Sequence, residues 1–189
     1  SLVTPLPCNG LGIGGDLLIA TCGTASDNQY TLQVWDIANP LAPQMRSTLV
    51  RTTPFGTVIE IAAPFVYVMS GAEIEIYDVS NRDVTIHTFT LPPNYGQQSC
   101  WHLTPIGNGH YLRQCADTTQ DDIVNLSNPN APRMTIPFGY PQTYEPPAVL
   151  GDKVYFVEGR TFEVWQINTP FGYLPFTNRY NLPFVQGRE

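Results

Sequence analysis

Charged side chains are scarce in this chain, and lysine is almost absent. Only 13% of the 189 residues are charged, against about 25% in an average globular protein, and lysine occurs once, at Lys153. The formal net charge is −7, and no run of basic residues occurs. Nucleic acids and anionic membrane surfaces are bound by clustered Lys and Arg, so we expect neither as a partner.

Long apolar runs and helical periodicity are missing as well. No segment approaches the roughly 18 apolar residues of a membrane span, so no membrane insertion is expected. No segment repeats its apolar residues at helical spacing, and 18 prolines disfavour long helices. Hydrophobic residues nevertheless make up 42% of the chain, which is typical of a globular protein rather than a disordered one.

What is present is a strand-and-turn segment that recurs four times. The copies are TLQVWDIANPLAP at 31–43, EIEIYDVSNRDV at 73–84, DDIVNLSNPNAP at 121–132 and FEVWQINTPF at 162–171. The turns of successive copies are spaced by 42, 47 and 41 residues. A period of about 40–50 residues in a strand-rich sequence indicates the blades of a β-propeller.

Apolar strands flank each copy and give four strands per unit in meander order. The predicted fold class is therefore all-β, a propeller of four repeated four-stranded antiparallel blades in a single domain. The units are approximately 8–50, 51–92, 93–138 and 139–189. Residues 2–7, LVTPLP, resemble the outer-strand segment FTLPP at 89–93, and residues 1–7 are a candidate ring-closing strand. Two interpretations stay open: a small closed ring, or a segment of a larger propeller or head-to-tail assembly.

The phrase VWDIANPLAP at 34–43, followed by an extended segment and an apolar strand, resembles the LVIVD repeat family. The resemblance covers all four units and is clearest at 31–43 and 73–84. It is weaker in the last two units, where Asn125 and Gln166 replace the aspartate found at Asp36 and Asp78. This replacement suggests a role in turn geometry rather than in chemistry. The resemblance implies a β-propeller of secreted and cell-surface proteins, commonly with more than four units, and it carries no catalytic motif.

Four cysteines occupy equivalent places in the first and third units. The two pairs are 14 and 15 residues apart, so neighbouring antiparallel strands can bring each pair to the Cα separation of about 5.5 Å that a disulfide needs. We predict the bridges Cys8–Cys22 and Cys100–Cys115, with reduced core thiols as the alternative. No metal site is expected, because no C-x-x-C pair occurs and the histidines are scattered. Disulfides imply secretion, display on the cell surface or the periplasm.

One hairpin of the third unit gathers polar and aromatic residues that suit a sugar or another small ligand. These candidate ligand-binding residues are Trp101, His102, His110, Tyr111 and Arg113. Alternating burial along strands explains them equally well without a ligand. Asn125 begins the sequon Asn-Leu-Ser and is a candidate glycosylation site. Five glutamates, Glu60, Glu75, Glu145, Glu158 and Glu163, are available for glycoside hydrolysis, but nothing in the sequence brings two of them together.

Aromatic residues interspersed with proline are frequent near the C-terminus and are typical of an interface. The candidate interface residues are Tyr140, Tyr144, Phe171, Tyr173, Phe176 and Tyr180. Packing between blades is the alternative explanation.

Together these features favour a non-enzymatic extracellular propeller that associates with itself as a structural surface scaffold, such as a filament or coat subunit. Its expected partners are further copies of itself, another surface protein or a glycan, and no cofactor is expected because no nucleotide-binding or nucleophile motif occurs. A glycan- or protein-binding propeller module is the first alternative. A polysaccharide hydrolase or lyase is the second.

Overall fold

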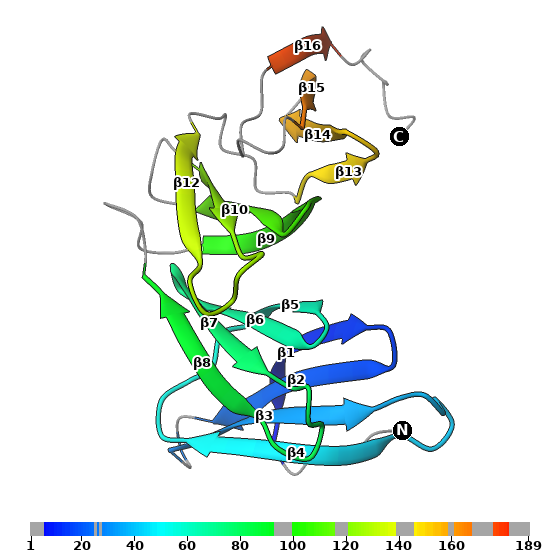
Figure 1. Ribbon diagram of the computed structural model, residues 1–189, viewed down its shortest axis with the longest axis vertical. Helices are drawn as coiled ribbons and strands as arrows, with labels where there is room; N and C mark the ends of the chain where they lie inside the picture. Colours follow the sequence, from blue (N-terminus) through cyan, green and yellow to red (C-terminus); the bar gives the residue numbers. More distant parts are fainter. Residues whose placement is uncertain are drawn as a thin grey trace, which may run out of the picture.

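The computed structural model describes residues 6–24, 26, 28–92, 100–115, 121–138, 146–158, 161–167 and 176–181. These residues form sixteen β-strands and no helix, arranged as four four-stranded antiparallel sheets (Figure 1). The described part of the chain therefore contains no helix with the length and hydropathy needed to span a membrane. Most of the candidate ring-closing segment 1–7 lies outside the described residues.

Each sheet is one blade, and its strands pair in chain order. Blade 1 contains β1 (Cys8–Gly14), β2 (Leu17–Thr24), β3 (Gln29–Asp36) and β4 (Gln44–Arg51). Blade 2 contains β5 (Val58–Ala62), β6 (Phe65–Ser70), β7 (Glu73–Asp78) and β8 (Ile86–Leu91). Blade 3 contains β9 (Cys100–Gly107), β10 (His110–Cys115), β11 (Asp121–Asn125) and β12 (Arg133–Phe138). Blade 4 contains β13 (Ala148–Leu150), β14 (Lys153–Glu158), β15 (Thr161–Gln166) and β16 (Phe176–Asn181).

The predicted fold class, a propeller of four meander blades, is confirmed. The blades follow one another along an arc, with blade 1 and blade 4 at its two ends (Figure 1). The innermost strands are the first of each blade, and β1 contacts β5 as β5 contacts β9.

The recurring aspartate acts in turn geometry, as its replacement in later units suggested. The Asp36 carboxylate accepts a hydrogen bond from the backbone N–H of Ala38 at 3.0 Å, and the Asp78 carboxylate accepts one from Ser80 at 2.7 Å. The Asn125 side chain accepts the equivalent bond from Ser127 at 3.0 Å. A short side-chain acceptor that bonds the N–H two residues on is an Asx-turn, and either Asp or Asn supplies it.

The hydrophobic core lies between blades rather than within one layer. One cluster joins blades 1 and 2, the next joins blades 2 and 3, and the last joins blades 3 and 4. Because successive side chains of a strand point to opposite faces of the sheet, one sheet contributes residues to two clusters. On β7, Ile74 and Ile76 pack toward blade 3, whereas Tyr77 packs toward blade 1. Each fully buried aliphatic side chain contributes roughly 1.5–3 kcal/mol.

Glycines on β1 allow blade 1 and blade 2 to approach at their innermost strands. A Cβ added at Gly12 would lie 2.6 Å from Ile59, and one added at Gly14 would lie 2.7 Å from Ile61. Only a residue without a side chain fits this spacing.

Both predicted disulfides are confirmed. Cys8 pairs with Cys22 across β1 and β2, and Cys100 pairs with Cys115 across β9 and β10, with Cα separations of 3.8 Å. No free cysteine remains. Two disulfides indicate that the protein folds in an oxidising environment.

Candidate functional site at the innermost strands

Every blade buries a polar side chain at the same position of its third strand, three residues before the turn residue. These side chains are Gln33, Glu75, Asp122 and Glu163. The sequence contains this series as Gln-Val-Trp, Glu-Ile-Tyr, Asp-Ile-Val and Glu-Val-Trp. The turns of these segments align in the sequence, but the polar position that recurs with them was not predicted as a site. A buried polar group between apolar neighbours in each repeat was the available signal.

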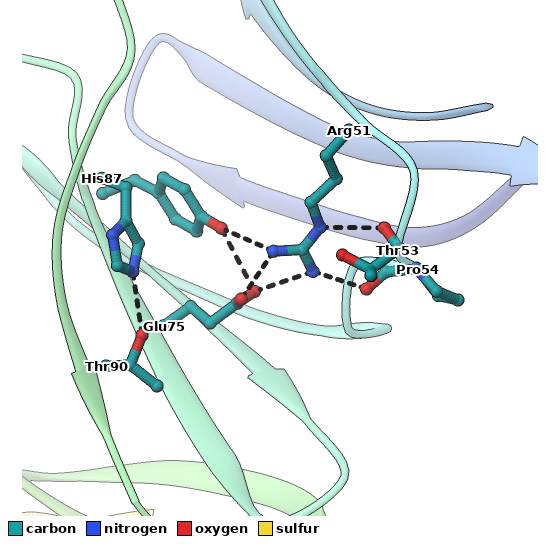
Figure 2. Close-up of polar contacts among 7 residues, drawn as sticks. Arg51, Thr53, Pro54, Glu75, His87 and Thr90 are labelled. Atoms are coloured by element: carbon teal, nitrogen blue, oxygen red, sulfur yellow. Dashed lines mark hydrogen bonds and ion pairs between the residues drawn. The ribbon is translucent and has the colours of Figure 1, made fainter. Parts of the chain in front are cut away.

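In blade 2 the side chain at this position is Glu75, and its bonds to an arginine of blade 1 link the two blades (Figure 2). Arg51, at the end of β4, donates to the Glu75 carboxylate at 2.6 and 3.1 Å. It also donates to the carbonyl oxygens of Thr53 and Pro54, and its guanidinium lies 3.8 Å from the centre of the Phe55 ring. Charge-assisted, two-pronged contacts of this kind are strong and specific. They occupy both carboxylate oxygens of Glu75, so this network ties blade 1 to blade 2.

Tyr77 completes the same network. Its hydroxyl donates to Glu75 at 3.1 Å, and burial, followed by the negative charge of Glu75, raises the pKa of Tyr77. The hydroxyl therefore stays protonated and serves as a donor at physiological pH. The His87 ring lies beside the Tyr77 ring, and its Nε2 atom is 2.9 Å from the Thr90 hydroxyl oxygen (Figure 2).

Blade 3 holds a fully buried ion pair between Arg113 and Asp122. The Arg113 Nε and Nη2 atoms donate to the two Asp122 oxygens at 2.8 and 2.5 Å, and Nη1 donates to the Ala72 carbonyl of blade 2 at 2.6 Å. Arg113 is 0% exposed. The structure thus places this predicted ligand-binding residue inside the contact between two blades.

Of the other four predicted ligand-binding residues, two are buried on β10 and two are partly exposed on β9, the innermost strand of blade 3. Tyr111 is buried, with its ring 5.3 Å from the Tyr67 ring. His110 is also buried, and its Nδ1 lies 3.1 Å from the Asn108 carbonyl. Trp101 and His102 are partly exposed on β9. Ligand binding by this set stays a prediction, but the set does not form one exposed cluster.

Most of the predicted interface aromatics fall on residues whose structure is not described. Tyr140, Tyr144, Phe171 and Tyr173 lie outside the described residues. Phe176 begins β16, and Tyr180 on the same strand is half exposed and lies 6.1 Å from the Phe162 ring. The Asn125 side chain is engaged by the Ser127 hydroxyl at 2.6 Å in addition to its turn bond, and its glycosylation stays a prediction.

Glu60 differs from Glu75, Asp122 and Glu163 because, among the described residues, no arginine forms an ion pair with it. It lies on β5, the innermost strand of blade 2, directly opposite Tyr67 in the β5–β6 register. It is partly buried, and among the hydrogen bonds and ion pairs of the described residues none involves its carboxylate. Burial raises the pKa of Glu60 above its ordinary value. The Glu60 carboxylate also acts on Tyr111 of blade 3. Burial raises the pKa of the Tyr111 hydroxyl, and the negative charge of Glu60 adds to that increase.

A broad hollow of about 430 Å³ lies on blade 4. Its lining residues are Lys153, Tyr155, Phe162, Val164, Thr177, Asn178 and Tyr180. Val154 and Phe156 on β14 pack toward blade 3, so Tyr155 between them points the opposite way. The hollow therefore occupies the sheet face that no described blade covers.

Metal-binding geometry is not found at any of these places. Within the described ranges, no group of three or more His, Cys, Asp or Glu side chains is arranged to hold an ion.

The chain resembles solved propeller structures at low sequence identity. A protein from Lactobacillus plantarum is 13% identical with a TM-score of 0.67, and the match covers 96% of this chain and 57% of that one. A "putative 6-phosphogluconolactonase" from Bacteroides uniformis is 10% identical with a TM-score of 0.71, covering 93% and 55%. One of the same description from Bacteroides fragilis is 9% identical with a TM-score of 0.67, covering 93% and 55%. This chain therefore spans a little over half the length of each of these three proteins.

No protein-family model matches the sequence, and no curated protein matches it. At 9–13% identity the structural likeness shows the fold alone.

The prediction of a self-associating surface scaffold is wrong. The neighbours whose descriptions carry an activity are described as lactonases and not as filament or coat subunits. The scarcity of charge that prompted the prediction has a different physical origin. Internal blades are covered on both sheet faces by their neighbours, so few strand positions are left for charged side chains.

Proposed function

We propose that this chain supplies the general base of a secreted β-propeller hydrolase that opens a small, uncharged, sugar-derived lactone. The observation that carries the proposal is Glu60, a partly buried carboxylate on an innermost strand that pairs with no arginine in the described part of the chain. The lactonase descriptions of the fold neighbours support the reaction class. The disulfides and the resemblance to LVIVD repeats support secretion.

The surroundings of Glu60 suit a base. A carboxylate with a raised pKa binds a proton more strongly than an ordinary one, and a catalytic base works best when its pKa approaches the working pH. A nearby arginine would lower that pKa and weaken the base. Tyr67 and Tyr111 are neutral instead, because burial raises the pKa of each hydroxyl.

The reaction needs only water and the substrate. Glu60 takes a proton from a water molecule while the water oxygen bonds to the lactone carbonyl carbon. The ring C–O bond then breaks, and the proton on Glu60 passes to the oxygen that leaves. The product is a hydroxy acid, and Glu60 returns to its ionised form.

The charges of the chain favour an unphosphorylated substrate. Recognition of a phosphate needs free arginine or lysine side chains, whereas five of the eight arginines form ion pairs with carboxylates. These are Arg46, Arg51, Arg82, Arg113 and Arg179. The net charge of −7 adds to the repulsion of a phosphate group.

The test measures lactone opening by the purified chain in a pH-stat, with glucono-δ-lactone and its 6-phosphate as substrates. We expect the uncharged lactone to be opened faster than in buffer alone, with kcat/KM rising as pH rises through the raised pKa of Glu60. Glu60→Gln should lower kcat by about 10²–10⁴-fold. Glu73→Gln, which changes an exposed glutamate of the same blade, should leave kcat unchanged.

Absence of acceleration by the wild-type chain, or full activity of Glu60→Gln, would overturn the proposal. Either result would favour the earlier expectation of a module without enzymatic activity. Unfolding curves of both variants establish that each is folded when it is assayed.

A further inference from the structure

A polar hollow of about 240 Å³ lies at the turn that leads from β11 into β12 of blade 3 (Figure 1). Its described lining residues are Asn125, Ser127, Asn128, Ala131 and Arg133. Asn125 and Arg133 form the cross-strand pair at the start of the turn. Blade 3 has a blade on each side, so this turn hollow is not part of the outer faces of blades 1 and 4. It is also separate from Glu60, which lies on an innermost strand of blade 2.

The two asparagines of the turn hollow have their oxygen atoms already occupied. The Asn125 Oδ1 atom accepts bonds from the Ser127 backbone N–H at 3.0 Å and from the Ser127 hydroxyl at 2.6 Å. The Asn128 Oδ1 atom accepts a bond from the Asn130 backbone N–H at 3.2 Å. Because a backbone N–H can only donate, these bonds fix which end of each amide is the oxygen. What the two side chains offer to a ligand is therefore their Nδ2 groups, which are donors.

Arg133 adds a positive charge to these donors. Its side chain is exposed, and within the described ranges no carboxylate pairs with it, whereas five other arginines form ion pairs. A guanidinium presents its N–H groups in a planar fork that fits a carboxylate. The Ser127 hydroxyl hydrogen is used in the bond to Asn125, so the Ser127 oxygen is left as an acceptor. The turn hollow thus offers several donors, one positive charge and one hydroxyl oxygen as an acceptor.

The corresponding turns of blades 1 and 2 lack this arrangement. The cross-strand pair at this position is Asp36–Gln44 in blade 1, Asp78–Ile86 in blade 2 and Asn125–Arg133 in blade 3. Asp36 already binds Arg82 of blade 2, at 2.8 Å. An Asx-turn is made equally well by Asp or Asn, so the turn itself does not call for Asn125. Relative to the other two blades, blade 3 has lost a negative charge and gained a positive one at the same place.

We propose that the turn hollow of blade 3 binds a small hydroxy acid. The ligand carboxylate accepts bonds from Arg133 and from the Asn125 Nδ2 group, and a ligand hydroxyl donates to the Ser127 oxygen. A hollow of about 240 Å³ is smaller than the sites of drug-sized ligands, which start at about 300 Å³, and so suits a molecule of monosaccharide size. One arginine matches a single carboxylate, and the net charge of −7 opposes a more highly charged anion. The proposal assigns a binding site and does not rest on the proposed hydrolysis.

An NMR titration that follows the Arg133 Nε–H and Asn125 Nδ2 signals tests the proposal. The chain is produced in a host without N-glycosylation, so that the Asn125 Nδ2 group is unmodified. We expect sodium gluconate to shift both signals with a dissociation constant of about 1 mM, from roughly 0.3 kcal/mol per non-hydrogen atom. At the same ionic strength, D-glucitol lacks the carboxylate and acetate lacks the hydroxyl groups. Each should bind at least about 10-fold more weakly than gluconate.

Three variants place in the turn hollow the residue found at the matching position of blade 1. Arg133→Gln should raise the gluconate dissociation constant at least about 10-fold. Asn125→Asp keeps the acceptor of the Asx-turn but replaces a donor with a negative charge, so it should raise the constant at least as much. Ser127→Ala should weaken gluconate but not acetate, because only gluconate has a hydroxyl to donate. Arg46→Gln is the matched control, since it removes an arginine from an exposed pair on blade 1, and it should leave the constant unchanged.

Four results would overturn the proposal. They are the absence of shifts with gluconate, equal affinity for gluconate and glucitol, full affinity of Arg133→Gln, and equal losses for Arg133→Gln and Arg46→Gln. Equal affinity for acetate and gluconate would also overturn it and would indicate a non-specific anion contact at Arg133. Urea unfolding curves of each variant establish that it is folded, so that a loss of binding is not a loss of structure.

Discussion

Replacing Arg113 with methionine should destabilise the protein far more than any surface substitution. The change removes two charge-assisted bonds to Asp122 and one bond to the Ala72 carbonyl, and Asp122 is left as a buried, unpaired carboxylate. Breaking one side of a buried ion pair costs roughly 3–5 kcal/mol. With a urea m-value of about 2 kcal/mol/M for a chain of this size, the unfolding midpoint should fall by roughly 2 M.

Urea titration followed by tryptophan fluorescence measures this effect, and two further variants test its cause. Arg113→Met with Asp122→Leu should recover most of the loss, because no buried charge remains. Arg46→Met removes an arginine from an exposed pair with Asp83 and should cost less than about 1 kcal/mol. Equal losses for Arg113→Met and Arg46→Met would refute the assignment of Arg113 to the contact between blades.

Three further perturbations test other parts of the structure. Gly12→Ala should lower the free energy of unfolding by roughly 1–3 kcal/mol, because its Cβ would lie 2.6 Å from Ile59; an unchanged melting temperature would contradict this packing. Replacing both Cys100 and Cys115 with serine should cost roughly 3 kcal/mol for a loop of about 15 residues, measured in urea without reductant and compared with the wild type in reductant. Glu60→Gln should stabilise the fold at neutral pH. Burial raises the pKa of Glu60 in the folded protein, so ionisation of its carboxyl lowers the free energy of unfolding as pH rises, and glutamine avoids this loss. That gain should vanish below the ordinary glutamate pKa of about 4.3, and a gain that persists there would contradict the reasoning.

The blade architecture could be predicted because it depends on local signals that repeat. The strand-and-turn segment around Asp36 recurs with its Asx-turn, and the cysteine pairs lie opposite each other on adjacent strands. Both features involve neighbours within one sheet. Spacing along the chain is sufficient to infer contacts of this kind.

Contacts between blades could not be predicted in the same way. Alternation of apolar and polar residues identifies a sheet with one covered face, but an internal blade is covered on both. His110, Tyr111 and Arg113 are consecutive or nearly so on β10, and all three are buried. Their polarity suggested exposure and a ligand, whereas their partners are found within blade 3 or on blade 2.

The buried acids show why Glu60 is the residue to test first. Arg51 of the preceding blade donates to Glu75, Arg113 of the same blade donates to Asp122, and Arg179 of the adjacent strand donates to Glu163. The fold thus brings an arginine to each of these three carboxylates. Within the described ranges no arginine pairs with Glu60 on β5, and burial destabilises its ionised form. A glutamine or leucine there would cost the fold less, so the carboxylate is better explained by chemistry at the innermost strands than by packing.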